Sequence, residues 1–332
     1  MKKIFFLIIT IIIIAGFYFF WLISVAVSAQ KNPAYFMVET GQTLAEVAQN
    51  LEAAGLIKSS SAFKTYAKIR GWQGQLIAGN HLLDKNMTTR EILRLLISSD
   101  NLKNERNITI IEGWRIEEIA DYLEANKIVS KKDFLNEVLT SNWRDKYVFL
   151  TGVEAKTLEG FLFPDTYRIF LNAKAKDIVK KMLDNFDSQL TAKMRNDISA
   201  AKFNIFEVLT LASIIEKEVP QDEDKKLIAD IFLKRLKAKI ALQSDATINF
   251  ITGQGQAQPT LDDLKIDSPY NTYKYRGLPS GPIANPGLAS LKAVIYPTAN
   301  PYYYFLTTLD EGTVIYSRTY EEHLKNKAKY LN

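Results

Sequence analysis

The feature that most constrains this chain is an uncharged apolar run near its amino terminus, from Ile4 to about Val27. At 1.5 Å per residue, a helix of this length spans the hydrocarbon core of a bilayer, which is about 30 Å thick. The apolar cores of cleaved signal peptides are shorter, about 7–15 residues, although Val27-Ser28-Ala29 does resemble a cleavage site. We therefore expect an uncleaved transmembrane anchor over residues 4–28, with a cleaved signal peptide as the alternative.

The charges on either side of this run give it a direction across the membrane. Lys2 and Lys3 lie on its amino-terminal side, whereas Lys31 is the basic residue closest to its other end. Because basic flanks are retained in the cytoplasm, we expect residues 1–3 to form a cytoplasmic tip. No second apolar run is long enough to bring the chain back. The sequence therefore predicts a single-pass protein whose body lies outside the cytoplasm.

Composition excludes several kinds of site. The chain has no cysteine, so disulfides, thiolate nucleophiles and cysteine-bound zinc are all excluded. Its two histidines, His81 and His323, are far apart in sequence, which disfavours a histidine-rich metal site. The net charge of +5 comes from lysines spread along the chain, and this distribution does not indicate a nucleic-acid footprint. We expect no metal, no cofactor and no nucleic-acid partner.

The 332 residues are enough for two folded units beyond the anchor. Strand-like runs alternate with helical periodicity, which predicts a mixed α+β fold. A polar, charged segment over 103–106 indicates a boundary near residues 101–107, so we expect a small domain over 33–105 and a larger one over 106–332. Expected elements include a helix over 61–69 capped by Ser60 or Ser61, a buried strand over 302–306 paired with 314–316, and a terminal helix over 319–330.

One sequence pattern occurs twice, about 72 residues apart. VETGQTLAEVAQNLEAAGLI begins at Val38, and IIEGWRIEEIADYLEANKIV begins at Ile110. Each copy predicts a strand, a turn at Gly41 or Gly113, and an amphipathic helix. Two copies are too few for a solenoid. We therefore expect a duplicated strand–helix module, with one copy in each domain.

A well-defined helix is predicted between Phe203 and Pro220, in the sequence FNIFEVLTLASIIEKEVP. Asn204 is a favourable N-cap, and Glu207 three residues later completes a capping box. Pro220 disfavours helical geometry at the residue before it, so the helix should end near Glu218. The apolar stripe that should face the core consists of Val208, Leu211, Ala212 and Ile215.

The two glutamates at the end of this helix differ in their expected surroundings. The residues three, four and seven positions before Glu218 are bulky and apolar, whereas the same offsets from Glu216 give a smaller and more polar set. Because side chains at these spacings are neighbours on a helix, Glu218 should be the more desolvated. Desolvation and the helix dipole both raise a carboxyl pKa, as a general acid near neutrality requires. The alternative is that both glutamates face water.

Other polar segments are candidates for the rest of a site. Gln243-Ser244-Asp245-Ala246-Thr247 is a compact cluster between predicted helices, and Tyr270-Asn271-Thr272-Tyr273 precedes a Gly- and Pro-rich loop over 277–287. Such a loop is irregular but stiff, and suits either a cleft wall or a simple connector. The helix after Pro220 has acids at its start and bases at its end, which matches the helix dipole and indicates a structural role. These residues are Asp222, Glu223, Asp224, Lys234, Arg235, Lys237 and Lys239.

Taken in order, a set of short motifs resembles the endolytic murein transglycosylases, the YceG-like family. The motifs are Glu112-Gly113, Glu159-Gly160, Phe163-Pro164-Asp165-Thr166-Tyr167, Leu211 to Glu218, Leu242 to Thr247, Tyr270 to Tyr273, Gly277-Leu278-Pro279 and Asn285-Pro286-Gly287. Each motif is weak by itself. Their ordered set extends over nearly the whole chain and is specific to the family.

The resemblance implies a fold and an activity. The fold would be α+β, with an N-terminal transmembrane helix, a small LysM-like α/β module and a larger mixed α+β catalytic domain. Glu218 would be the catalytic acid/base of a lytic transglycosylase that cuts the N-acetylmuramic acid–N-acetylglucosamine bond within nascent peptidoglycan strands. The products would carry 1,6-anhydro ends, so the enzyme would act as a glycan-strand terminase. Substrate-binding or supporting residues would be Glu216, Gln243, Asp245, Thr247, Asn271, Tyr273 and Asn285.

The resemblance also implies a location and partners. The protein would lie in the bacterial cytoplasmic (inner) membrane, with its carboxyl-terminal domain on the periplasmic or external face. Its partners would be glycan strands and cell-wall synthases, the penicillin-binding proteins.

Two other functions stay open. The duplicated module and the anchor also fit a non-catalytic peptidoglycan-binding scaffold, and a hydrolase using water would need a second carboxylate, for which Asp245 and Asp165 are candidates.

Overall fold

The structure is a computed structural model that describes residues 2–98, 105–255, 259–308 and 312–331. The chain divides into two units, residues 1–106 and 107–332, and each has its own hydrophobic core. Residues 101–104 of the expected boundary segment lie outside the described residues. Helices and strands occur together in both units, so the expected mixture of helix and strand is confirmed.

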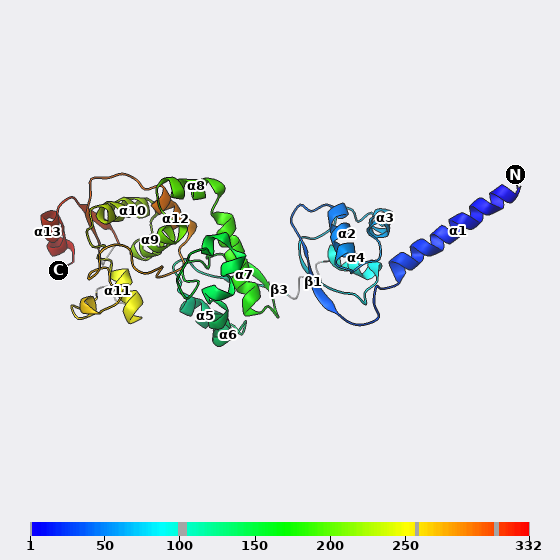
Figure 1. The fold of residues 1–332 in the computed structure, drawn as a ribbon, viewed down its shortest axis with the longest axis horizontal. Helices are drawn as coiled ribbons and strands as arrows, with labels where there is room; N and C mark the ends of the chain where they lie inside the picture. The colour runs from blue at the N-terminus through cyan, green and yellow to red at the C-terminus, as the bar shows by residue number, and fades with distance from the viewer. Residues whose placement is uncertain (1, 99–104, 256–258, 309–311, 332) are drawn as a thin grey trace. The chain divides into compact units, whose positions relative to one another are not determined.

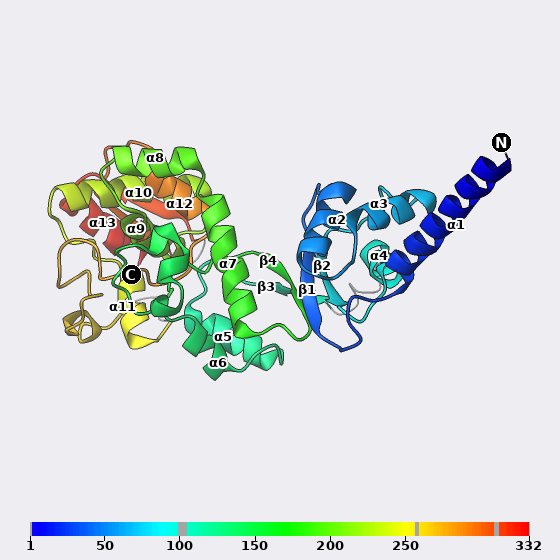
Figure 2. The same ribbon diagram turned by 45° about the vertical axis from the view of Figure 1, so that its right-hand side comes forward.

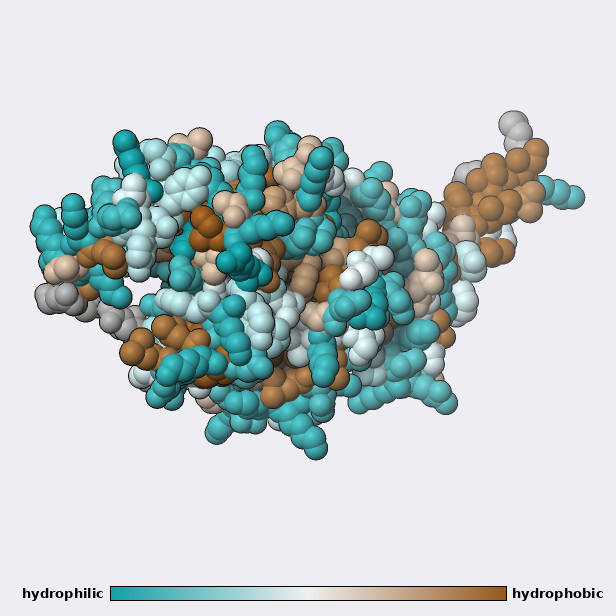
Figure 3. Space-filling model, turned by 60° about the vertical axis from the view of Figure 1, so that its left-hand side comes forward, coloured by the Kyte–Doolittle hydropathy of each residue, from teal (hydrophilic) through white to brown (hydrophobic). Residues whose placement is uncertain are grey.

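The first unit begins with the apolar helix α1 (Lys2–Ser24), which corresponds to the expected anchor. Among the described residues it is the one helix that by itself is long and apolar enough to cross a membrane, over Phe6–Ser24. Its apolar side chains are mostly exposed and form the brown projecting surface in Figure 3. Such a surface is unfavourable in water, and it suits contact with lipid.

The last turn of α1 packs against the rest of the first unit. Ile23 is buried in the core of that unit. The Thr89 hydroxyl donates to the Leu22 carbonyl at 3.2 Å, and the Lys58 ammonium donates to the Ala26 carbonyl at 2.6 Å. The apolar helix is therefore joined to the folded unit by side chains as well as by the backbone.

The rest of the first unit is a strand–helix–helix–strand arrangement followed by one more helix. The elements are β1 (Pro33–Val38), α2 (Leu44–Ala53), α3 (Ser60–Ile69), β2 (Gly79–Asp84) and α4 (Thr89–Ile97). β1 and β2 pair antiparallel, with Phe36 opposite His81. The side chain of Ser59 caps α3, one residue before the expected caps.

The remaining elements belong to the second unit, except that β3 begins two residues before it. These are β3 (Glu105–Thr109), α5 (Ile116–Ala125), α6 (Lys131–Glu137), β4 (Thr166–Phe170), α7 (Ala175–Gln189), α8 (Ala192–Ala200), α9 (Ile205–Glu218), α10 (Asp222–Lys237), α11 (Asp245–Thr252), α12 (Leu288–Ile295), β5 (Tyr304–Thr307), β6 (Val314–Ser317) and α13 (Tyr320–Tyr330). Short 3₁₀ turns cover Thr140–Asn142, Arg144–Lys146, Val148–Leu150 and Asp263–Lys265. β3 lies beside β4 (Figure 2). β5 pairs with β6.

The duplicated module is confirmed, with one copy in each unit. β1 leads through Gly41 (φ +86°) to α2, and β3 leads through Gly113 (φ +78°) to α5. Both helices are followed by a left-handed residue, Gly55 (φ +66°) in one copy and Lys127 (φ +54°) in the other. The buried residues also correspond: they are Val47, Ala48 and Leu51 in α2, and Ile119, Ala120 and Leu123 in α5.

α9 is the buried centre of the second unit and packs against α8, α10, α11 and α12 (Figure 1). The expected capping box is present: Asn204 and Glu207 each accept from the other's backbone N–H at 2.9 Å. Every residue from Val208 to Ile215 is buried, well beyond the predicted stripe. With α8, from which it is bent by 96°, α9 is apolar enough to resemble a broken membrane span. Packing in the core accounts for this apolar character.

The carboxyl-terminal hairpin confirms the expected pairing of two strands. Phe305 in β5 is opposite Tyr316 in β6, and the strands are antiparallel. The expectation that the first strand is buried is wrong, because Leu306 is the buried residue of β5 while its other three are partly exposed. α13 packs on both strands and is itself mostly exposed.

Candidate active site

The carboxyl end of α9 presents two acids to different surroundings. The helix ends at Glu218, as expected, and Val219 is extended before Pro220. A residue before proline is biased away from helical geometry, which fixes this end. Glu216 and Glu218 are about 200° apart around the helix axis because each residue advances about 100°. The two carboxyl groups therefore lie on nearly opposite sides of α9.

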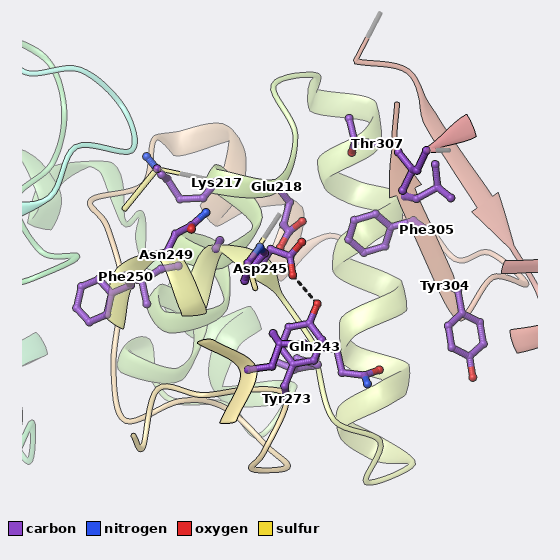
Figure 4. Close-up of a pocket in the computed structure, with 18 of the residues that line it drawn as sticks. Lys217, Glu218, Gln243, Asp245, Asn249, Phe250, Tyr273, Tyr304, Phe305 and Thr307 are labelled. Atoms are coloured by element: carbon purple, nitrogen blue, oxygen red, sulfur yellow. Dashed lines mark hydrogen bonds between the residues drawn. The ribbon is translucent and has the colours of Figure 1, made fainter. Parts of the chain in front are cut away.

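Glu218 lies in a cleft of about 820 Å³, a volume within the range of ligand-binding pockets. α9, α10, α11, β5 and α13 all contribute side chains to its walls. Four of the predicted site residues line this cleft together: Glu218, Gln243, Asp245 and Tyr273. Figure 4 shows the carboxyl groups of Glu218 and Asp245 directed into the same space.

The Glu218 carboxyl group is desolvated and has a hydroxyl partner. Burial raises the pKa of Glu218 to about 7, the hydrogen bond from Ser244 lowers it, and the charge of Asp245 raises it. The Ser244 hydroxyl donates to Oε1. A carboxyl group with this pKa is present in both protonation states near neutral pH, which suits a group that donates and then accepts a proton. The raised pKa expected for Glu218 is therefore found.

Asp245 gives the cleft a second carboxyl group. It is the first residue of α11, so the polar cluster expected between helices includes the start of a helix. The Tyr273 hydroxyl donates to Oδ1 of Asp245, as the dashed line in Figure 4 shows. Burial raises the pKa of Asp245, and it also raises the pKa of Tyr273 far above its ordinary value. Tyr273 therefore stays protonated and keeps donating to Asp245.

Gln243 lines the cleft in a fixed orientation. Its backbone has φ +55°, an uncommon left-handed conformation for a residue with a side chain. Its side-chain oxygen accepts from Nη2 of Arg235 at 2.5 Å, and its backbone N–H donates to the Thr272 carbonyl at 3.1 Å. Such a backbone costs about 1–3 kcal/mol, which these contacts offset.

Thr247 and Asn271 lie behind the wall of the cleft, and both are fully buried. The Thr247 hydroxyl donates to the Ser244 carbonyl at 2.7 Å. The Asn271 amide donates to the carbonyls of Leu264 and Ile266 at 2.9 and 2.8 Å. Thr247 and Asn271 were expected either to bind substrate or to support the site. These bonds favour support of the cleft backbone.

Asn285 is also fully buried, and it joins three segments of the second unit. Its side-chain oxygen accepts from the Leu162 N–H at 3.0 Å. Its amide donates to the Trp114 carbonyl and to Oε1 of Glu159, both at 2.9 Å. Burial raises the pKa of Glu159 to about 8. Asn285 thus connects the Gly- and Pro-rich loop to the second copy of the module.

Glu216, on the other side of α9, is held in a buried ion pair. Its Oε1 lies 3.0 Å from Nζ of Lys225, and the two side chains are 8% and 4% exposed. Its Oε2 accepts from the Gly287 N–H at 2.9 Å and from the Ser290 hydroxyl at 2.8 Å. Both carboxylate oxygens are therefore occupied by donors from the protein, which favours a structural role for Glu216.

A smaller depression of about 410 Å³ adjoins the same helix end. It is lined by Glu112, Glu216, Lys217, Glu218, Val219, Pro220 and Lys225. Burial, followed by the charge of Glu216, raises the pKa of Glu112. Lys217 and Glu218 line both this depression and the larger cleft. Glu218 therefore borders both depressions.

Sequence reasoning missed two residues of the cleft. Ser244 lies within a motif that we quoted, but its hydrogen bond to Glu218 joins positions 26 residues apart. The charge pattern of its helix predicts a structural role for Arg235 among the bases at the helix end, yet Arg235 is 5% exposed and lines the cleft. A signal was present, because Arg235 follows Ile228 and Phe232 by seven and three residues and therefore shares their buried face.

Neither Asp165 nor His81 lines the cleft. Asp165, a candidate second carboxylate, does not line the cleft, and its Oδ2 accepts from the Asn185 amide at 2.9 Å. His81 is fully buried, with Nε2 2.8 Å from the Ile77 carbonyl oxygen. Within the described ranges, no group of three or more acidic or histidine side chains is placed to hold a metal ion.

The chain is similar in sequence to a known family and to proteins of other bacteria. Residues 36–329 match the YceG-like family. The endolytic murein transglycosylase of Bacillus subtilis (strain 168) is 32% identical over 314 residues, covering 91% of this chain and 86% of that protein. The endolytic murein transglycosylase of Streptococcus pneumoniae serotype 2 (strain D39 / NCTC 7466) is 31% identical over 321 residues, covering 89% of this chain and 58% of that protein. The chain thus spans less than two thirds of the pneumococcal relative.

A solved structure has the same fold. The 2.6 Å crystal structure of a yceG-like protein from Listeria monocytogenes matches with a TM-score of 0.62 and 32% sequence identity. The match covers 90% of this chain and 100% of that chain.

Proposed function

This chain belongs to the YceG-like family, and we propose that it is a membrane-anchored lytic transglycosylase that cleaves peptidoglycan strands internally. The curated relatives described above carry the name endolytic murein transglycosylase. The observation in this chain that carries the proposal is the Glu218 carboxyl group, which lies in the large cleft with a pKa raised to about 7.

The proposed reaction uses Glu218 twice and consumes no water. Protonated Glu218 donates to the oxygen between N-acetylmuramic acid and N-acetylglucosamine as the bond from that oxygen to the muramoyl C1 breaks. The N-acetylglucosamine leaves with the proton on its 4-hydroxyl. The muramoyl 6-hydroxyl then attacks C1 and gives its proton to the Glu218 carboxylate, which closes a 1,6-anhydro ring and restores the acid. A pKa near ambient pH supports both proton transfers.

The neighbouring residues have supporting roles in this proposal. Asp245, which accepts a hydrogen bond from Tyr273, would stabilise positive charge that develops at C1. Gln243 presents a polar side chain to the bound sugar. Thr247, Asn271 and Asn285 hold the backbone around the cleft.

The two depressions beside Glu218 support an internal cut. An enzyme that cleaves within a strand must hold sugars on both sides of the scissile bond. Lys217 and Glu218 line both the 820 Å³ cleft and the 410 Å³ depression. A strand that crosses this helix end would therefore place its glycosidic oxygen at Glu218, with sugars on either side.

We also propose a placement for the rest of the chain. α1 would anchor the protein in the cytoplasmic (inner) membrane, with residues 1–3 in the cytoplasm, and Lys2 and Lys3 support this orientation. Residues 33–105 would form a LysM-like, glycan-binding module, and residues 106–332 the catalytic domain on the periplasmic or external face. The separate core of the first unit supports such a module. Anchoring would bring the enzyme beside the cell-wall synthases, the penicillin-binding proteins.

Product analysis tests the activity. The full-length protein in detergent is incubated with uncrosslinked glycan strands, and the products are examined by mass spectrometry. We expect 1,6-anhydro-muramoyl ends from the wild type and none from Glu218→Gln. Glu216→Gln is the matched control on the same helix and should keep cleavage wherever it remains folded. Full activity of Glu218→Gln together with loss in Glu216→Gln would refute the assignment of the acid.

A hydrolase is the second candidate, because Asp245 gives the cleft another carboxyl group beside Glu218. Glycosidases that use water require two carboxyl groups. This candidate predicts reducing ends without anhydro-muramic acid, and loss of cleavage in Asp245→Asn. A non-catalytic scaffold, the third function considered, predicts that Glu218→Gln fully complements a deletion strain.

A further inference from the structure

Arg235 is a buried cation without an acidic partner. It is 5% exposed, and Nη2 donates to the neutral side-chain oxygen of Gln243. Its guanidinium lies 5.4 Å from the Tyr304 ring centroid, and Nε is buried without a partner. In the part of the chain that the structure describes, no carboxylate is within ion-pair distance of it. Charged side chains are rarely buried unless they are paired, because desolvating an ion is costly.

Arg235 has donor capacity left for a ligand in the cleft. A guanidinium has five N–H groups and stays protonated. The buried Nε lacks a partner and Nη2 is occupied by Gln243, whereas Nη1 is not among the buried unpartnered atoms and forms no hydrogen bond in the described ranges. Nη1 is therefore not fully enclosed, and since Arg235 lines the cleft, Nη1 is the nitrogen left to donate to a ligand there.

Two basic side chains of α13 lie at the same end of the cleft. His323 and Lys327 are four residues apart, so they share one face of the helix, and both line the cleft. The His323 ring stacks on Tyr304, with centroids 5.5 Å apart and planes at 26°. Burial, then the charges of Lys327 and Arg235, lower the pKa of His323, as expected when the three groups are close together.

Among the described residues, no acid of the cleft lies within ion-pair distance of this cluster, although the charge of Asp245 interacts with that of Lys327. Asp245 is close to Lys327 but accepts a hydrogen bond from Tyr273, and Glu218 lies beyond Asp245. The order along the cleft is therefore Glu218, Asp245, and then the basic end. An anion bound at that end would lie beside the reacting sugar and leave Glu218 free.

We propose that Arg235, His323 and Lys327 bind a carboxylate of the peptide stem carried by the muramoyl residues. A guanidinium is well matched to a carboxylate, which accepts two parallel N–H bonds. The N-acetylated sugars of a strand are uncharged where the lactyl group is joined to its peptide, so the carboxylates of a stem-bearing strand are in the peptide. The inference rests on the proposed function, because it names a second part of the same substrate that the cleft recognises.

Three substrates distinguish the sources of the carboxylate. The first is uncrosslinked strands with intact stems, the second is the same strands after chemical amidation of the carboxylates, and the third is strands from which an amidase has removed the stems, exposing lactyl carboxylates. For the full-length protein in detergent, we expect kcat/KM to be at least about tenfold higher on intact strands than on the other two, as loss of charge-assisted hydrogen bonds predicts.

Each other outcome overturns part of the reasoning. Stem-free strands as good as intact ones would assign the cluster to the lactyl group and refute the stem assignment. Equal cleavage of all three substrates to anhydro ends would overturn the inference and leave the proposed function standing. Absence of anhydro ends from all three would overturn the proposed function, and the inference with it.

Variants test the residues themselves. Arg235→Gln should lose most of the tenfold preference for intact strands, and Lys327→Gln should lower cleavage of intact strands about two- to fivefold, as expected for one exposed ion pair. Lys325→Gln, on the same helix but outside the cleft, should match the wild type. Arg235 also holds Gln243, so a merely structural effect would lower the rate on all three substrates alike. Within the described ranges Lys327 forms no side-chain hydrogen bond or ion pair, so an unchanged preference in Lys327→Gln together with a uniform loss in Arg235→Gln would refute the inference.

Discussion

Replacing Glu218 by glutamine should make the folded protein more stable at neutral and alkaline pH while it removes the activity. The pKa of Glu218 is raised from 4.5 to about 7 in the folded protein, mainly by burial. Between these two values the folded state keeps a proton that the unfolded state has lost, so the free energy of unfolding falls as pH rises through this window. Glutamine cannot ionise, and its side-chain oxygen can still accept from Ser244. The variant therefore avoids the cost of burying the charge.

The size of this effect follows from the difference between the two pKa values. At 1.36 kcal/mol per pKa unit, the difference corresponds to up to about 3 kcal/mol. We expect Glu218→Gln to exceed the wild type by about this amount at pH 8 and to equal it near pH 4, where the carboxyl group is protonated in both states. A gain in the free energy of unfolding that grows with pH is unusual for a substitution at an active site, and it is specific to a desolvated acid.

Urea unfolding of the full-length protein, followed by tryptophan fluorescence between pH 4 and 8, measures the effect. Trp143 is buried in the second unit and reports on its unfolding. Glu216→Gln is the control with the opposite sign, because it leaves Lys225 buried without its partner and should destabilise by about 3–5 kcal/mol. A stability difference between wild type and Glu218→Gln that does not change with pH would refute the reasoning, as would a less stable variant at pH 8.

Three further predictions concern the same unit. The kcat of the wild type should fall about tenfold per pH unit above pH 7, because Glu218 must be protonated to act as the acid; a flat rate from pH 7 to 9 would exclude it as the acid. Gly160→Ala places a Cβ 2.5 Å from Cβ of Pro282 at a φ of +87° and should lower the free energy of unfolding by about 1–3 kcal/mol, whereas Gly74→Ala, with open space around it, should change it little. Asn285→Ala removes the acceptor of the Leu162 N–H and one donor to Glu159, which keeps its bonds from the Ile116 N–H, and it should cost about 2–4 kcal/mol in thermal unfolding. A loss below about 0.5 kcal/mol would show that other groups or water replace Asn285.

Local sequence was sufficient to place α9 and to separate its two acids. The Asn204 cap and Pro220 act within a few residues of the ends they determine, so both ends of α9 were predicted correctly. The apolar neighbours of Glu218 along the helix correctly indicated the direction of its pKa shift. These are short-range effects, which a sequence displays directly.

The partners of these acids depend on tertiary packing, and the sequence does not display it. Ser244 and Asp245 reach Glu218 only because α11 packs against α9. Thr247 and Asn271 carry the same donors and acceptors whether they face a ligand or the protein backbone, so a motif cannot distinguish the two. The structure assigns their bonds to the backbone. The motifs and the resemblance they carry therefore indicated the polar residues around the site, while the orientation of these side chains required the fold.

The duplicated module shows how one sequence pattern acquires two roles. In the second copy, the Gly113 N–H donates to the Asn285 carbonyl at 2.8 Å, and the Gly113 carbonyl accepts from Lys217 at 3.3 Å. A Cβ at Gly113 would meet Glu216 and Lys217 at 3.5 Å, an ordinary contact, so the positive φ and not lack of space requires glycine there. The corresponding Gly41 has open space around it. The second turn is thus committed to supporting the helix end that carries Glu218, which leaves the first copy as the better candidate for glycan binding.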